Sequence, residues 1–333
     1  MLRHSSDSEP GYTRQRKGRY WAYYDGDNRI TDRATIDRLN AIALPPAYRD
    51  AWFCKDPNGH LQATGIDDRG RKQYRYHPEF RAQAEANKFA GLADFGKALP
   101  KIRRKVDKDL RLGALSRDKV VAAVVRLLDD DYLRVGNEEY AISNQSYGAT
   151  TLLSRQVHDD GRKVKMRFKG KSGVDQEVTI TDRTLRRIVR QLQELPGQPL
   201  FQYINGDGKP HPITSSEVND YIREAAGRDF TAKDFRTWGA TVLAFEQMLD
   251  KADNARISVK TMIEPVAEAL GNTVPMSRKA YVHPALIEAV KDNPRDPLEG
   301  LERPRARKWL SSCEVALIPF LSKTGKKASK AAA

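Results

Sequence analysis

The chain of 333 residues is long enough for two domains with at least one sizeable hydrophobic core. Its 58 Lys and Arg residues exceed its 44 Asp and Glu residues, and the formal charge of +14 favours a polyanionic partner over the alternative of a basic protein with no specific partner. The N-terminus is polar, which predicts no signal peptide, and no apolar run is long enough to predict a membrane span. The two cysteines are far apart in the sequence, which predicts neither a disulfide framework nor a zinc site. Together these features predict a soluble intracellular protein.

The first part of the chain, to about residue 85, is predicted to form a small, mostly β module. Asp, Pro and Gly turn residues separate short extended runs with the sequences GRYWAYY, AWFC, HLQAT and RKQYRY. Between the first two runs, ITDRATIDRLNAIALPP is predicted to be a short helix that ends at Pro45 and Pro46.

From Pro78 onward the pattern is helical. In the segment SRDKVVAAVVRLLDDDY, Ser116 is the expected N-cap. Apolar side chains follow at helical spacing and are expected to share one face of this helix: Val120, Val121, Val124, Leu127 and Leu128.

A β region interrupts the helices at residues 150–180. Apolar and cationic side chains alternate there, with Val164, Met166 and Phe168 expected on one side and Lys163, Lys165 and Arg167 on the other. The turn sequences DDG and GKSG divide the region into a predicted three-stranded antiparallel sheet. Helices are predicted again at 214–226, where Thr214 and Glu217 form a capping box, and at 231–249. The lysine-rich tail KTGKKASKAAA is predicted to be disordered.

Several common catalytic motifs are missing from the sequence. The GKS at residues 170–172 is no P-loop, because the required earlier glycine position is Lys165 and strands are expected on both sides. The six histidines are scattered, and neither HExxH nor GxSxG occurs. If the chain is an enzyme, its chemistry is therefore expected to come from cations and a tyrosine.

Seven candidate residues stand in short motifs along the chain. YLRVGNEEYA contains Arg134 and Tyr140, FKGKSG contains Lys171, TAKDFRTWGAT contains Lys233 and Arg236, and GNTVPMSRKAY contains Asn272 and Tyr281. Lys233 and Arg236 are one helical turn apart and are expected on one face. Each motif taken alone is more typical of a solvated or salt-bridged surface than of a catalytic site.

In this order the motifs resemble those of the type IB DNA topoisomerases, specifically the compact poxvirus-like branch found in bacteria. The resemblance extends over nearly the whole chain and includes LPPAYRDAWFCKDPNGHLQATGIDDRGRKQYRYHP. It implies an α+β, two-domain DNA clamp related to the tyrosine recombinases. The implied parts are a β-rich DNA-binding domain at 1–85, a mainly helical catalytic domain at 86–320 that contains the three-stranded sheet, and a basic disordered tail at 321–333.

The resemblance also implies the catalytic positions: Arg134, Lys171, Arg236, Asn272 and Tyr281, with Lys233 assisting. Tyr281 is the expected nucleophile, and it would form a covalent 3′-phosphotyrosyl bond. Guanidinium groups and an amide NH₂ suit the negative charge that phosphoryl transfer places on the nonbridging oxygens. Lys171 is the expected general acid, because arginine hardly gives up its proton. Neither a metal nor another cofactor is implied.

By the same resemblance, Gln73, Tyr74 and Tyr76 are expected to touch DNA. In a strand, Gln73 lies on one face and the two tyrosines on the other, and a half-buried aromatic strand is the alternative interpretation. Tyr140 is a weaker candidate for a phosphate contact.

The implied activity is ATP-independent relaxation of positive and negative supercoils through transient single-strand cleavage, strand rotation and religation. Duplex DNA, preferably supercoiled, is the expected partner of a monomeric, cytoplasmic, nucleoid-associated isomerase. A tyrosine recombinase is the first alternative, but those enzymes usually carry His-x-x-Arg where this chain has Lys233 and Arg236, and they lack the QYRYHP module. A non-enzymatic DNA-binding protein of the same fold is the second.

Overall fold

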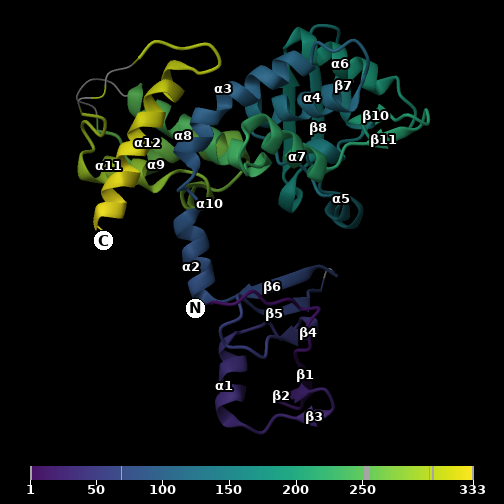
Figure 1. Ribbon diagram of the computed structural model, residues 1–333, viewed down its shortest axis with the longest axis vertical. Coiled ribbons are helices and arrows are strands. Elements are labelled where there is room, and N and C mark those ends of the chain that lie inside the picture. The colour runs from purple at the N-terminus through teal and green to yellow at the C-terminus, as the bar shows by residue number, and fades with distance from the viewer. Residues whose placement is uncertain (1, 69, 251–255, 300, 302–303, 332–333) are drawn as a thin grey trace. The chain divides into compact units, whose positions relative to one another are not determined.

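The computed structural model describes residues 2–68, 70–250, 256–299, 301 and 304–331, and for residues 84–87 and 324–331 it describes only the backbone. The chain forms two compact units, Met1–Phe89 and Ala90–Ala333. Figure 1 shows that strands dominate the first unit and helices the second. The α+β fold class expected from the sequence is confirmed.

The first unit is built on a six-stranded sheet in the order β3-β2-β1-β4-β5-β6, with antiparallel neighbours. Its elements are β1 (Tyr12–Lys17), β2 (Tyr20–Asp25), β3 (Asn28–Arg29), α1 (Arg33–Ala41), β4 (Arg49–Phe53), β5 (Leu61–Ile66), β6 (Lys72–Tyr76) and α2 (Pro78–Asn87). The side chain of Leu39 on α1 packs against Tyr23, Phe53 and Ala63, so α1 covers one face of the sheet (Figure 1).

The predicted strands and the predicted helix of this unit are present, but β1 and β3 were not predicted. The sequence of β1, YTRQRK, is mostly charged or polar, and most of its side chains are exposed. Hydrophobic alternation therefore gives no signal there. β1 is specified instead by the tight turn at Gly18, whose φ of +60° suits glycine, and by pairing of all six of its residues with β2.

The second unit is built around the buried helix α4 (Arg117–Asp130). Its other elements are α3 (Leu92–Asp109), α5 (Glu138–Asn144), η1 (Ala149–Thr151), η2 (Ser154–Gln156), β7 (Val157–Asp159), β8 (Val164–Lys169), η3 (Lys171–Gly173), β9 (Asp175–Ile180), α6 (Arg183–Gln193), β10 (Gln202–Ile204), β11 (Pro210–Pro212), α7 (Ser215–Ala226), α8 (Ala232–Leu249), α9 (Val259–Leu270), α10 (Val274–Ala280), α11 (Pro284–Asp292) and α12 (Ser312–Ala331).

Helix α4 is buried more completely than the sequence indicated. Ala122, Ala123 and Val125 are buried along with the five residues expected on its apolar face. Helices α3, α7 and α8 pack against α4 from different sides, and a helix enclosed in this way needs apolar side chains all round. The predicted N-cap is confirmed, since the Ser116 hydroxyl accepts a hydrogen bond from the Lys119 N–H.

The predicted antiparallel sheet is present in the order β7-β8-β9, with Val164, Met166 and Phe168 on its buried face. The predicted capping box of Thr214 and Glu217 also begins α7. Helix α12 continues through Ala331, so residues 321–331, for which the sequence predicts disorder, are helical. Alanine and lysine are among the better helix formers. The last two residues of the predicted tail, 332–333, lie outside the described residues.

A buried ionic cluster connects α12 to the centre of the second unit. The Arg103 guanidinium on α3 donates to Asp129 on α4, at 2.7 and 2.9 Å, and to the Glu314 carboxylate on α12, at 2.8 and 2.9 Å. The Trp238 indole N–H of α8 donates to the same Glu314 carboxylate at 2.9 Å. In Figure 1, α12 accordingly lies beside α8 and α3.

No helix among the described residues combines the length and the apolarity needed for a bilayer span.

Replacing Arg103 by alanine is expected to destabilise the second unit by about 3–5 kcal/mol, because two carboxylates would remain buried without their cation. The measurement is the urea midpoint of unfolding. Arg33→Ala is the matched control. Its partner Asp37 lies on the surface, where an ion pair contributes about 0–1 kcal/mol. Equal losses for the two variants would contradict the importance of the buried cluster.

Candidate active site

The segment that carries Arg134 follows α4 and is held in place by backbone hydrogen bonds. The Ala149 N–H donates to the Arg134 carbonyl at 2.9 Å, and the Thr150 N–H donates to the Val135 carbonyl at 2.7 Å. A methyl group added at Gly148 would lie 2.6 Å from the Gly136 backbone nitrogen, so only glycine permits this close approach. The backbone that presents Arg134 is therefore fixed by its neighbours.

Arg236 lies on α8 and is almost completely buried, with 5% of its surface exposed. Its guanidinium donates to the carbonyl oxygen of Tyr132, just after α4, and to that of Leu270, the last residue of α9. One cation thereby connects α8 to the ends of the two helices that lead to Arg134 and to Asn272.

Asn272 and Tyr281 lie at the two ends of the short helix α10. Helix α9 ends at Gly271, whose φ of +59° is a conformation that favours glycine, and Asn272 follows directly. The Asn272 Oδ1 accepts a hydrogen bond of 3.0 Å from Arg134 Nη2. Tyr281 is the C-cap residue of α10, and its carbonyl accepts a hydrogen bond from the Thr241 hydroxyl on α8 at 3.2 Å.

The Tyr281 ring lies next to the buried arginine. The Arg236 guanidinium carbon is 5.2 Å from the centroid of the ring. Burial by itself raises the pKa of the phenol, but the charges and hydrogen bonds of Arg236 and Arg134 outweigh burial, so the pKa of Tyr281 is lowered. This environment favours the phenolate, the nucleophilic form of a tyrosine.

Two buried donors beside this tyrosine have no hydrogen-bond partner among the described residues: Asn272 Nδ2 and Arg236 Nε. A buried donor without a partner costs free energy, so such donors point to a ligand that accepts from them. Burial and the charge of Arg134 also lower the pKa of Arg236 to about 10. An anion bound here would satisfy both donors and relieve the repulsion between the two arginines.

The two candidate lysines are placed differently from these four residues. Lys171 is exposed in the turn between β8 and β9, and Lys233 is exposed on the first turn of α8, whereas Arg236 on that helix is buried. Neither amine makes a hydrogen bond or an ion pair within the described parts of the chain. The structure thus brings together Arg134, Arg236, Asn272 and Tyr281, and leaves both lysines free to meet a ligand.

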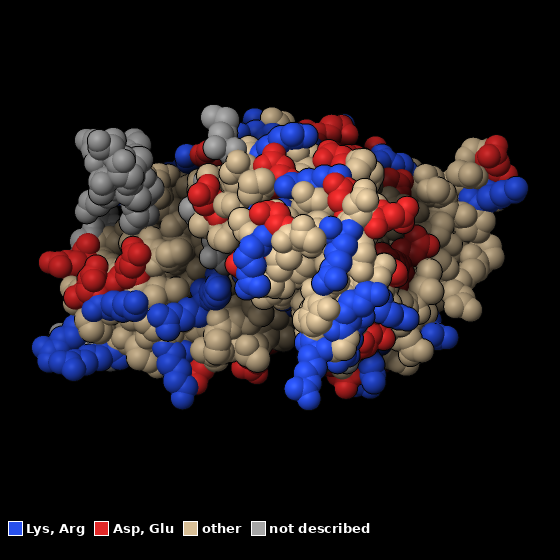
Figure 2. Space-filling model, turned by 90° about the horizontal axis from the view of Figure 1, so that it is seen from below, with Lys and Arg blue, Asp and Glu red and all other residues tan. Residues whose placement is uncertain are grey.

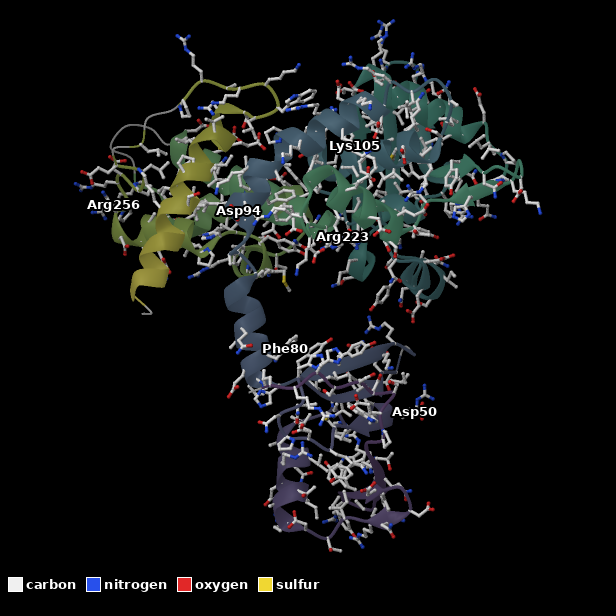
Figure 3. All side chains as sticks on the ribbon, viewed as in Figure 1. Asp50, Phe80, Asp94, Lys105, Arg223 and Arg256 are labelled. Carbon is white, nitrogen blue, oxygen red and sulfur yellow. The ribbon has the colours of Figure 1, made fainter. Side chains whose placement is uncertain are left out.

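The residues expected to touch DNA in the first unit lie on both faces of β6. Tyr74 and Tyr76 are 48% and 41% exposed, and their rings are stacked with centroids 6.2 Å apart. Figure 3 shows Phe80 projecting from α2 beside this strand, and its ring centroid is 5.4 Å from that of Tyr76. Gln73 faces the other way, and its amide donates to the Asp67 carboxylate at 3.0 Å.

Tyr140, the remaining candidate, is 44% exposed on α5.

On the face shown in Figure 2, Lys and Arg side chains are interspersed with Asp and Glu instead of forming one continuous basic patch. Among the described residues, no group of three or more His, Cys, Asp or Glu side chains could hold a metal ion.

A contact between Tyr132 and Gly239 was missed by sequence reasoning. Tyr132 has a φ of +52°, and a methyl group added at Gly239 on α8 would lie 2.1 Å from its ring. The signal was a glycine within the helical motif RTWGAT, because an interior helical glycine costs about 1 kcal/mol and usually has a packing reason. This contact positions the Tyr132 carbonyl that receives the Arg236 hydrogen bond.

Comparison with known proteins assigns the family. The model of the eukaryotic DNA topoisomerase I catalytic core matches residues 77–291, and that of the bacterial DNA topoisomerase IB N-terminal domain matches residues 20–67. The chain belongs to the type IB DNA topoisomerase family. DNA topoisomerase 1B of Acanthamoeba polyphaga mimivirus is 33% identical over 315 residues, which cover 88% of this chain and 94% of the viral one.

A second topoisomerase IB relative is more distant. DNA topoisomerase 1B of Vaccinia virus (strain Copenhagen) is 20% identical over 276 residues, covering 78% of this chain and 83% of the viral protein. Among solved structures, the XerH site-specific recombinase in a post-cleavage complex with palindromic difH substrate has a TM-score of 0.38 and 19% identity. That match covers 58% of this chain and 50% of the recombinase. The topoisomerase IB resemblance inferred from the sequence is confirmed by the family models and the viral relatives.

Gly239→Ala is expected to reduce the relaxation of supercoiled plasmid, the activity of this family, because the added methyl group displaces Tyr132 and with it the Arg236 and Arg134 positions. Overpacking of this kind also costs about 1–3 kcal/mol of stability. The measurements are the relaxation rate and the thermal unfolding midpoint. Gly113→Ala, where the methyl group meets open space, is the control and should retain the parent rate. A fully active Gly239→Ala variant would refute the positioning role of this contact.

Proposed function

We propose that this chain relaxes positive and negative supercoils in duplex DNA through a covalent bond between Tyr281 and the 3′ phosphate of a transiently cleaved strand. The free strand end rotates, and religation restores the duplex without ATP. The observation that carries the proposal is the pair of unpartnered buried donors beside a tyrosine whose pKa two arginines lower.

Cleavage is a substitution at phosphorus. The Tyr281 Oη, as phenolate, forms a bond to the phosphorus, and the bond from phosphorus to the 5′ oxygen breaks. The new phosphotyrosyl bond keeps the energy of the bond that was lost. The 5′ hydroxyl can therefore attack it in the reverse reaction, which releases the tyrosine and reseals the strand.

The arginines and the asparagine act on the phosphoryl oxygens. Negative charge spreads over the nonbridging oxygens in the transition state, and each preorganised donor there contributes on the order of 3 kcal/mol. Arg236 supplies its Nε–H, and Asn272 its Nδ2 amide hydrogens, both of which are buried and unpaired. Arg134, which holds Asn272 through the amide oxygen, orients that amide so that the NH₂ group remains available.

The 5′ oxygen needs a proton as it leaves. Lys171 is the proposed donor, since a primary ammonium gives up its proton far more readily than a guanidinium and the turn leaves this amine exposed. Lys233, exposed near the start of α8, assists it. The reaction as proposed uses side chains alone, with neither a metal ion nor another cofactor.

Duplex DNA is the proposed partner, with a preference for supercoiled molecules, and the proposed form is a monomer in the cytoplasm, associated with the nucleoid. Tyr74, Tyr76 and Tyr140 offer exposed phenols for contacts with phosphates or base edges. Gln73 contacts DNA in this proposal either after its hydrogen bond to Asp67 breaks or through its second amide N–H while that bond remains.

Tyr281→Phe is expected to bind duplex DNA as the parent protein does but to form no covalent adduct, because the ring remains and the nucleophilic oxygen is gone. The measurements are a gel-shift titration and denaturing-gel detection of protein on end-labelled DNA, using plasmid or duplex without paired recombination sites. An adduct trapped on the variant would refute the assignment of Tyr281.

Lys171→Ala is expected to lose about 10²- to 10⁴-fold in the single-turnover cleavage rate, the usual contribution of a general acid. Cleavage should recover on a duplex with a 5′-bridging phosphorothiolate, because sulfur leaves without needing a proton. Lys233→Ala, measured alongside, shows how much the second amine adds. If sulfur restores Lys233→Ala but not Lys171→Ala, the two lysines have exchanged roles.

A further inference from the structure

The side chain of Gln176 lies between the two turns that carry Lys171 and Asn272. A methyl group added at Gly271 would lie 2.5 Å from Gln176 Nε2, and one added at Gly170 would lie 3.0 Å from Gln176 Cγ. Gly170 directly precedes Lys171, and Gly271 directly precedes Asn272. One side chain on β9 therefore packs against the residue before each of two proposed catalytic groups.

The two turns differ in the contacts of their side chains. The turn at Gly271 and Asn272 is closed by backbone hydrogen bonds of 3.0 Å from the Gly271 N–H to the Glu268 carbonyl and 2.9 Å from the Asn272 N–H to the Ala267 carbonyl. The Asn272 side chain is also bonded to Arg134. This turn is part of the helical body of the second unit.

The turn at Lys171 is also closed by backbone hydrogen bonds, of 2.8 Å from the Gly170 N–H to the Val174 carbonyl and 3.1 Å from the Gly173 N–H to the Gly170 carbonyl, but its side chains have little packing. Residues 171–175 are all exposed, and the backbone is left-handed at both Ser172, with a φ of +66°, and Gly173, with a φ of +76°. Gln176 is the first half-buried residue after this turn, and its backbone pairs with Phe168 on β8. Its side chain is thus attached to the sheet and reaches the turn at Gly271.

We infer that Gln176 is a positioning residue. Its contact with the Gly271 turn fixes the position of Lys171. It fills the space between the two glycines, so the exposed hairpin tip is held at a defined distance from Asn272. This inference rests on the proposed function, because it matters only if Lys171 must deliver a proton to the leaving oxygen while Asn272 binds the same phosphate.

The test compares two substrates in single-turnover cleavage, an ordinary duplex and one with a 5′-bridging phosphorothiolate. For Gln176→Ala, cleavage of the ordinary duplex is expected to fall about 10- to 100-fold, the effect of misplacing a catalytic group by about 1 Å. Cleavage of the phosphorothiolate is expected to fall much less, since it does not need the acid. Glu177→Gln, which alters the neighbouring surface residue paired with Lys165 and Arg167, is the control and should retain the parent rate on both.

Two further variants separate positioning from general loss of structure. Gln176→Met keeps a side chain of similar length and loses only the 3.2 Å hydrogen bond from Nε2 to the exposed Asp175 carbonyl, so it is expected to retain most of the activity if the contact with the glycines is what positions Lys171. Gly170→Ala introduces its methyl group against Gln176 at a φ of −84°, which alanine tolerates. It should slow cleavage in the parent protein but cause no further loss when combined with Gln176→Ala.

The outcomes distinguish this inference from the proposed function. If the phosphorothiolate fails to rescue Lys171→Ala, the assignment of the general acid is wrong. If the phosphorothiolate rescues Lys171→Ala, the acid assignment stands. In that case the positioning role of Gln176 is refuted if Gln176→Ala loses activity equally on both substrates, or if it loses activity on neither. Strictly additive effects of Gly170→Ala and Gln176→Ala would also refute the positioning role of Gln176.

Discussion

The competition between burial and positive charge at Tyr281 decides what this site can do. A buried phenol alone is a poor nucleophile, because removal from water disfavours its ionised form. Arg236 and Arg134 reverse that effect and lower the pKa of Tyr281. The same two cations are suited to the charge that develops on a phosphate, so the groups that lower the pKa of Tyr281 also suit the phosphate that this tyrosine is proposed to attack.

The guanidinium of Arg236 connects the segments that carry these side chains. Arg236 donates to the carbonyls of Tyr132 and Leu270, so the ends of α4 and α9 are joined to α8 at the point from which Arg134 and Asn272 emerge. Its Nε–H has no partner in the described structure. Burial and, after it, repulsion from Arg134 lower the pKa of Arg236 to about 10, so both effects disfavour the charged guanidinium. A bound phosphate would offset both effects.

Much of the fold and of the site could be predicted from the sequence, because the motifs occur in a characteristic order. Alternation in the segment KVKMRFK predicted β8, and the Ser116 cap predicted the start of α4. What could not be predicted depends on contacts between distant segments. The interior glycine of RTWGAT indicates a close contact but not its partner Tyr132, and no local pattern indicates that Gln176 reaches Gly271, because each contact joins residues that are far apart in the sequence.

The residues proposed to contact DNA show the same limit. Strand alternation predicted that Tyr74 and Tyr76 share one face of β6 and that Gln73 lies on the other, and the structure has this arrangement, with the tyrosines on the exposed face. It could not reveal that Asp67 already accepts a hydrogen bond from the Gln73 amide, because that bond depends on how the turn before β6 closes. The chain's charge likewise predicted an anionic partner without showing that cations and carboxylates are interspersed on the face in Figure 2.

The most direct measurement is an NMR titration of protein labelled with ¹³Cζ-tyrosine, in which Tyr281→Phe identifies the resonance of Tyr281 among the 13 tyrosines. If the arginines outweigh burial, Tyr281 will ionise below the ordinary tyrosine pKa of about 10, and Arg236→Gln will move its titration to higher pH. A Tyr281 resonance that titrates above that value in the parent protein, or that does not respond to Arg236→Gln, would contradict the activation of this tyrosine by its cations.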